Sequence, residues 1–146
     1  MFVSTYWPRL DEKGRFFLPP RHREQLVDGL VMARGQERCL VIYPTAEFGR
    51  MVEETAASLP DILKVRDFKR MASAMAVDTR PDKQGRISIP TELREYANLD
   101  KDIVVTGAFD HVEVWNPTAW AEYTEKKEPD YIALNAVVGM PGQNTR

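Results

Sequence analysis

The sequence has no hydrophobic run that approaches the roughly 20 apolar residues needed to span a bilayer. Its opening stretch, MFVSTYWPRL, is too short in apolar length and too aromatic for a signal peptide. The single Cys39 excludes an internal disulfide, and together with only His22 and His111 it forms no cluster at the spacing of zinc ligands. We therefore expect a cytoplasmic protein with no membrane partner, no structural metal and no cofactor.

The chain also lacks an excess of basic charge. It has 20 Lys and Arg against 22 Asp and Glu, a net charge of −2, whereas domains that bind nucleic acid through charge are usually basic. Positive charge is concentrated locally: residues 9–24 carry a net charge of +2. Residues 62–75 carry +3 and offer either a solvated helix face or a basic contact surface, through Lys64, Arg66, Lys69 and Arg70 against Asp67.

What is present is an internal repeat. The segment DEKGRFFLPPRHRE at 11–24 recurs as DKQGRISIPTELRE at 82–95, with Asp, Gly, Arg, Pro, Arg and Glu at matching positions. After one extra residue in the second half, VMARGQERCLVIY at 31–43 matches IVVTGAFDHVEVW at 103–115. Two copies are too few for a solenoid. The repeat therefore predicts a duplicated small module whose two halves pack on each other.

Each half begins with the same pattern of a strand and a short helix. Phe16 and Leu18 in the first half, and Ile87 and Ile89 in the second, are buried-type residues that alternate with outward positions, which is typical of a strand. A proline follows each strand and is expected to end it. In the second half Thr91 stands where an N-cap residue is expected, so a short helix follows.

The remainder of each half predicts a hairpin and a second helix. β-rich segments flank turns that carry Gly35 or Gly107, as in hairpins. Thr45 precedes apolar residues at helical spacing, and Asn116 is followed by Pro117, which suits the first position of a helix. A further helix from Ile62 is expected to link the two halves.

Both repeats open on a turn that ends in Gly-Arg, Asp11 to Arg15 and Asp82 to Arg86. The aspartate is suited to accept backbone N–H groups across a tight turn, and the glycine to supply a positive φ. The arginine is then expected to project into solvent, where a guanidinium suits phosphate or the O6 and N7 atoms of guanine. The simpler interpretation, that each arginine only pairs with its aspartate, is compatible with this one. The candidate DNA-binding residues are Arg15, Arg86, Lys13, Lys83, Gly14 and Gly85, and the turn-shaping residues are Asp11 and Asp82.

Other side chains are candidates with a second interpretation. Arg9, Arg23 and Arg94 are possible secondary DNA contacts, although helix arginines such as the last two are often ion-pair partners at the edge of a core. The repeated aromatic pair Tyr43 and Trp115 could stack on bases. Its strand periodicity favours packing in the core instead.

At these residues the chain resembles the MraZ family of bacterial transcriptional regulators, in which two tandem AbrB/SpoVT-type modules each begin with a D-x-x-x-R turn. The likeness extends over LDEKGRFFLPPRHREQL, CLVIYPTAEF, QGRISIPTELREYANL and VEVWNPTAW. It implies an α+β, mainly β fold, in which swapped-hairpin modules form a pseudo-two-fold β-barrel with packed helices. It also implies a homo-oligomeric ring that binds short G-rich direct repeats in DNA, upstream of the division and cell-wall gene cluster, in the cytoplasm on the nucleoid.

On this basis we divide the chain into four parts. Residues 5–47 are expected to form the first SpoVT-AbrB module, 48–75 a helical linker, 76–119 the second module and 120–146 a C-terminal helix and tail. The stretch from Tyr131 matches no pattern of the family, and the final MPGQNTR is predicted to be frayed.

Two other functions stay open. The first is an antitoxin-like module of the same barrel type whose turns contact a partner protein; it would use a hydrophobic tail, for which the candidate is Tyr131 to Met140. The second is an enzyme, but the sequence has no paired acid and base, no nucleophile with a neighbouring base and no phosphate-binding glycine loop. We expect no enzymatic activity and no small-molecule ligand. Our hypothesis is a ring that gathers its Arg15 and Arg86 turns and so gains affinity for double-stranded DNA through avidity.

Overall fold

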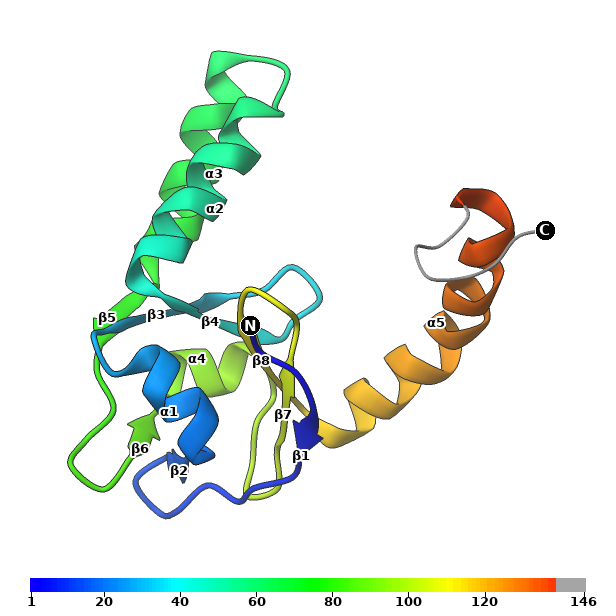
Figure 1. Ribbon diagram of the computed structural model, residues 1–146. Coiled ribbons are helices and arrows are strands. Elements are labelled where there is room, and N and C mark those ends of the chain that lie inside the picture. The colour runs from blue at the N-terminus through cyan, green and yellow to red at the C-terminus, as the bar shows by residue number, and fades with distance from the viewer. Residues whose placement is uncertain (139–146) are drawn as a thin grey trace. The chain divides into compact units, whose positions relative to one another are not determined.

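The computed structural model describes residues 1–138, and its elements follow the sequence repeat (Figure 1). The first half contains β1 (Thr5–Tyr6), β2 (Arg15–Phe17), α1 (Pro20–Leu26), β3 (Leu30–Arg34), β4 (Leu40–Pro44) and α2 (Thr45–Ala57). After α3 (Ile62–Ala74), the second half contains β5 (Val77–Thr79), β6 (Arg86–Ser88), α4 (Thr91–Tyr96), β7 (Val104–Gly107), β8 (Val112–Trp115) and α5 (Pro117–Val138). Met1–Asn116 form one compact unit and the chain from Pro117 a second.

The strands of the first unit form two antiparallel sheets. One has six strands in the order β1-β7-β8-β4-β3-β5, and the other is the two-stranded ribbon β2-β6. The β4-β8 pair joins the hairpins of the two halves. At the edges the first strand of each half pairs with the hairpin of the other half, β1 with β7 and β5 with β3. The two halves are thus interleaved, and neither has a complete sheet of its own.

The pairing register shows that the repeat is arranged about a pseudo-two-fold axis. Phe16 pairs with Ile87 in the ribbon, and Val41 pairs with Glu113 in the large sheet. In each pair the two residues occupy equivalent positions of the sequence repeat. Equivalent residues of two copies face each other in this way where an axis passes between them. The axis therefore passes through the centres of both sheets.

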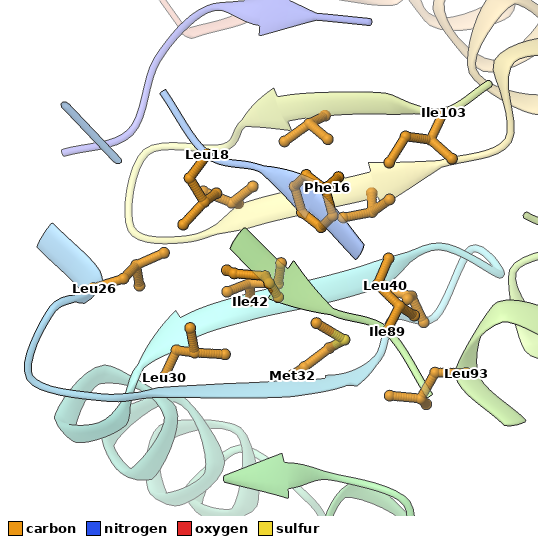
Figure 2. Close-up of a cluster of buried hydrophobic side chains, with 14 of the residues drawn as sticks. Phe16, Leu18, Leu26, Leu30, Met32, Leu40, Ile42, Ile89, Leu93 and Ile103 are labelled. Carbon is orange, nitrogen blue, oxygen red and sulfur yellow. The ribbon is translucent and has the colours of Figure 1, made fainter. Parts of the chain in front are cut away.

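The core lies between these two sheets. Figure 2 shows Phe16 and Leu18 from the first half of the chain and Ile89 from the second directed toward Leu40 and Ile42 of the large sheet. Burying an aliphatic or aromatic side chain of this size contributes about 1.5–3 kcal/mol. Phe16 is 1% exposed, whereas the next residue, Phe17, is 58% exposed. The ribbon therefore has one face in the core and one face outside, as the predicted alternation requires.

The predicted α+β class is confirmed. The six-stranded sheet is open, with β1 and β5 at its edges, and closure into the barrel implied by the resemblance is not seen in the part of the chain that the structure describes. The predicted strands after each Gly-Arg and both hairpins are present. The α2 helix begins at Thr45, before the start that we gave to the linker at residue 48.

One predicted helix cap was wrong. Helix α4 begins at Thr91, and the residue in the N-cap position is Pro90, with φ −60° and ψ 152°. The pyrrolidine ring fixes φ, so Pro90 supplies the extended residue before the helix without a side-chain cap. The hydroxyl of Thr91 instead accepts a hydrogen bond from Nη2 of Arg94 at 2.8 Å.

Helices α2 and α3 form an antiparallel pair that extends from the sheet (Figure 1). The α3 helix begins after Asp61, whose carboxylate accepts a backbone N–H of the first turn at 2.8 Å. A salt bridge of 2.8 Å joins Lys69 to Glu53 of α2, and Arg70 lies 3.7 Å from Asp67. Two of the four basic side chains of α3 are therefore in ion pairs, which reduces the positive surface predicted for residues 62–75.

The second unit is the helix α5, which begins at Pro117, as the Asn-Pro pair predicted, and continues through Pro129 to Val138. Within it the rings of Trp120 and Tyr123 stack with centroids 6.2 Å apart. The helix starts before the predicted boundary at residue 120, and the tail predicted to fray lies outside the described residues. Across residues 1–138, no helix combines the length and apolar character that crossing a membrane requires.

Candidate nucleic-acid interface

The first turn is organised by the carboxylate of Asp11. Its Oδ1 accepts the backbone N–H groups of Lys13 and Arg15, each at 2.9 Å, and its Oδ2 accepts Nε–H of the Arg15 side chain at 2.7 Å. A backbone bond from Asp11 N–H to the carbonyl of Arg15, 2.9 Å, closes the turn. One carboxylate thus fixes both the backbone of the turn and the side chain of its arginine.

The second turn has the same geometry. Asp82 accepts the N–H groups of Gln84 and Arg86 at 2.9 Å each, and Nε–H of Arg86 at 2.8 Å. Its own N–H donates to the carbonyl of Arg86 at 2.9 Å. The two residues between the aspartate and the glycine differ between the turns, so the identity of these intervening residues does not decide the local conformation.

The glycines shape the turns, as predicted. Gly14 has φ +76° and Gly85 has φ +80°, in the region that favours glycine. Both are buried, and in both the N–H donates to the carbonyl of the turn's aspartate, at 3.0 and 2.9 Å. Their carbonyls accept N–H groups from the opposite half, from Ile89 for Gly14 at 2.8 Å and from Leu18 for Gly85 at 3.1 Å. The backbone groups of both glycines are therefore already used within the protein.

The arginines are less exposed than expected. The side chains of Arg15 and Arg86 are 26% and 23% exposed, because each guanidinium folds back onto its aspartate. The expectation that they project freely into solvent was therefore wrong in degree. The contact with the aspartate uses Nε, and within residues 1–138 the two terminal nitrogens of each guanidinium make no hydrogen bond to the protein. These nitrogens remain available to a ligand.

Both aspartates are held in the charged form. The hydrogen bond that the backbone N–H of Arg15 donates to the carboxylate is the main cause of the lowered pKa of Asp11. The side chain of Arg15 lowers this pKa further. The pKa of Asp82 is lowered for the same reason by Arg86. Each arginine is therefore paired with an ionised carboxylate at neutral pH, and the net charge of each turn depends on the residues between them.

Those intervening residues are Glu12 and Lys13 in the first turn and Lys83 and Gln84 in the second. All four are exposed. With its aspartate and arginine, the first turn has no net charge and the second a net charge of +1. The two turns thus share a geometry but differ in the field that they present to a polyanion.

The ribbon β2-β6 brings the two arginines onto one surface. Arg15 pairs with Ser88, and Phe17 pairs with Arg86. Because successive side chains of a strand alternate between faces, these four lie on the outer face, opposite Phe16. Diagonal neighbours on such a ribbon lie about 7–8 Å apart. Sequence reasoning did not place the two turns together, because nothing local to either turn indicates that β2 pairs with β6.

The secondary candidates have other partners. Arg9 forms an exposed salt bridge with Asp102, with 3.3 Å between Nε and Oδ1. Arg23 and Arg94 are half-buried, and each guanidinium lies over the glycine of the opposite turn, Arg94 over Gly14 and Arg23 over Gly85. The repeated aromatic residues Tyr43 and Trp115 are buried, at 7% and 3% exposure, as packing in the protein predicts. They lie on the face of the large sheet opposite Leu40 and Ile42 and not in the core between the two sheets.

A groove to which the sequence analysis gave no role lies beside the α2-α3 pair, with a volume of about 450 Å³. His111 lines it, stacked on Tyr43 and bonded to Asp110 at 2.7 Å and Glu113 at 2.9 Å. Burial lowers the pKa of His111, but the two carboxylates raise it by more. The signal in the sequence is the spacing of His111 and Glu113, two residues apart at the start of β8, which directs both side chains to the same side of the chain.

Among residues 1–138, no three His, Cys, Asp or Glu side chains gather to hold a metal ion.

The comparisons with known proteins cover nearly the whole chain. The family described as MraZ protein, putative antitoxin-like, matches residues 1–70 and 73–136. The transcriptional regulator MraZ of Cutibacterium acnes is 54% identical over 138 residues, which are 94% of this chain and 97% of that protein. The proteins of the same name from Kineococcus radiotolerans and Thermobifida fusca are 47% and 44% identical over 142 residues, 97% of this chain and 99% of each.

Proposed function

Because this chain belongs to the MraZ family, we propose that it is a DNA-binding transcriptional regulator and that its two Asp-to-Arg turns contact the DNA. Its relatives carry the name transcriptional regulator. The family is not one of enzymes, so the enzyme alternative is abandoned. The proposed targets are short direct repeats upstream of the division and cell-wall gene cluster, bound in the cytoplasm on the nucleoid.

The observation that carries this proposal is the common face of the β2-β6 ribbon, on which Arg15 and Arg86 lie. A two-stranded ribbon fits the major groove of B-DNA, and guanidinium groups there bind guanine or phosphate in a bidentate manner. The aspartates support this role, since they fix the direction of each arginine through Nε and leave its terminal nitrogens for the DNA. We assign the contacts to these arginines and to Lys13 and Lys83. The glycines act through the shape of the turn.

The proposal includes a homo-oligomeric ring. One chain has a net charge of −2, and each arginine is paired with a carboxylate, so one ribbon offers little excess positive charge. Linking several weak contacts on repeated sites raises apparent affinity by about 10² to 10⁴. The ring would thus explain both the tolerance of an acidic composition and the preference for repeats. Closure of the two sheets into a barrel around the shared core belongs to the same proposal.

The test is a gel-shift titration of the purified protein against a duplex from its own upstream region. A matched duplex with the repeats scrambled is the control. We expect tight binding to the first duplex alone. The affinity should fall as the salt concentration rises, and the slope of log affinity against log salt should be proportional to the number of phosphates contacted. Equal affinity for both duplexes would contradict sequence-specific binding, and light scattering on the same samples measures the oligomer.

A second candidate function rests on the family description, which includes the word antitoxin-like. In that case a partner protein would bind the exposed apolar side chains near the end of α5, Tyr131, Ile132 and Leu134. This stretch is helical in the described residues and is not an extended tail. Co-purification of one stoichiometric partner that is lost on Ile132→Asp, with DNA binding unchanged, would support this function.

A further inference from the structure

We propose that Arg23 and Arg94 are positioning residues, each of which holds the DNA-contacting turn of the opposite half. Arg94 acts on the turn of Arg15, and Arg23 acts on the turn of Arg86. This inference rests on the proposed function of the turns. It adds that neither turn can be set in place by its own half alone.

The first contact joins helix α4 to the first turn. The guanidinium of Arg94 lies against Gly14 so closely that a Cβ atom at Gly14 would overlap Nη1 and Cζ. The same Cβ would lie 3.0 Å from the carbonyl oxygen of Ile89, which also belongs to the second half. A hydrogen bond of 2.8 Å runs from Ile89 N–H to the Gly14 carbonyl. The glycine preceding Arg15 is thus held on two sides by the second half.

The second contact is the equivalent of the first by rotation about the pseudo-two-fold axis. The guanidinium of Arg23 in α1 lies against Gly85, where a Cβ atom would overlap Nε and Cζ. Leu18 N–H donates to the Gly85 carbonyl at 3.1 Å. Within residues 1–138, the buried Nε of Arg23 makes no hydrogen bond. A guanidinium packed on a glycine in this way supports the turn through contact and is poorly placed to reach DNA through that edge.

The effect on function follows from chain connectivity. Gly14 and Gly85 each directly precede the arginine that we assign to DNA. We call each contact of an arginine with the glycine of the opposite turn, Arg94 with Gly14 and Arg23 with Gly85, a clamp. When a clamp is removed, the backbone of the glycine gains conformational freedom, and the guanidinium of the next residue loses its fixed direction. Only glycine, which has no Cβ, allows a guanidinium to approach the backbone this closely. These two positions therefore require glycine for a second reason, beside their positive φ. The direction of each DNA-contacting arginine therefore depends on an arginine from the other half of the chain.

The first test needs no DNA. Hydrogen exchange of the intact oligomer, followed by mass spectrometry, is measured on Arg94→Ala and Arg23→Ala. We expect Arg94→Ala to speed exchange in residues 11–15 more than in 82–86, and Arg23→Ala to do the reverse. Faster exchange in the turn of the same half, or no difference between the turns, overturns the proposal. Arg21→Ala, an exposed arginine on α1, is the matched control and should change neither turn.

The second test is a double-mutant cycle in DNA affinity. Arg94→Ala alone should weaken binding by about tenfold, the equivalent of ~1.4 kcal/mol. In an Arg15→Ala background the same change should have little further effect, whereas in Arg86→Ala it should keep its full effect. Equal effects in both backgrounds overturn the positioning role. If Arg15→Ala and Arg86→Ala themselves leave affinity unchanged, the proposed function fails, and hydrogen exchange still decides the clamp.

A conservative variant separates position from charge. Arg94→Lys keeps the positive charge but loses the planar group that covers Gly14. We expect it to reproduce the weaker binding and faster exchange of Arg94→Ala, with a melting temperature close to that of the native protein. Full affinity in Arg94→Lys would show that charge alone matters and would overturn the proposal.

Discussion

The two turns of this protein are the same in geometry and different in charge. In both, one carboxylate accepts two backbone N–H groups and one Nε–H, with lengths that agree within 0.1 Å. Between aspartate and glycine, the first turn has Glu12 and Lys13, and the second has Lys83 and Gln84. The comparison shows which residues fix a turn and which are left to adjust what it presents. Within each turn, the three shared residues make the hydrogen bonds that shape it, and the two variable ones set its charge.

The largest expected effect comes from removing both arginines, which tests whether the shared geometry serves DNA at all. The double variant Arg15→Ala/Arg86→Ala should lose on the order of 100-fold or more in affinity, since each well-placed bidentate contact contributes about 1–3 kcal/mol. The measurement is a titration by fluorescence anisotropy at fixed salt. Arg21→Ala is the control for a lost exposed arginine. Unequal single variants would show that the turns contribute unequally.

The next effect is on stability and tests whether the two glycines are equivalent. Gly14→Ala and Gly85→Ala should each lower the free energy of unfolding by about 1–3 kcal/mol, because both have positive φ and both lie under a guanidinium. Gly49→Ala is the matched control, since a Cβ there meets nothing within 4 Å. In helix α2 it should stabilise by about 0.5–1 kcal/mol. Urea unfolding measures all three, and a stable Gly14→Ala would contradict the clamped turn.

A smaller effect is expected from acid. The pKa values of Asp11 and Asp82 are lowered in the folded state, so their contribution to stability is complete above the unfolded pKa of about 3.9. It is lost as the pH falls through the lower, folded pKa. The melting temperature should therefore fall more steeply below about pH 4 in the native protein than in Asp11→Asn/Asp82→Asn. Parallel curves would show that these carboxylates do not stabilise the fold through their charge.

The smallest effect comes from exchanging the variable residues. Glu12→Lys/Lys13→Gln gives the first turn the intervening pair of the second and changes its net charge from zero to +1. DNA affinity should rise only a few-fold, and the salt dependence should steepen by about one unit of slope. The reverse exchange, Lys83→Glu/Gln84→Lys, is the matched control and should do the opposite. A change in turn geometry would contradict the division between shape and charge.

Much of the fold could be predicted because it depends on residues close together in sequence. The hairpins at Gly35 and Gly107, the strands after each Gly-Arg and the shaping of each turn by its aspartate all follow from short-range hydrogen bonds and periodicity. The cap at Thr91 was placed one residue late, because Pro90 itself supplies the extended conformation. The exposure of Arg15 was overestimated, because the sequence does not show that Nε of Arg15 binds Asp11 and turns the guanidinium back onto the carboxylate.

The sequence by itself determined the repeat, the two turns and the absence of an excess of positive charge. Only the tertiary structure decided that Phe16 pairs with Ile87, which places both turn arginines on one face, and that Arg94 and Arg23 cover the glycines of the opposite turns. The physical reason is that a turn of five residues satisfies its own hydrogen bonds, whereas the apolar face of each short strand is buried only against the other half. Burial, which acts over the whole chain, thus assembles what local hydrogen bonding has shaped.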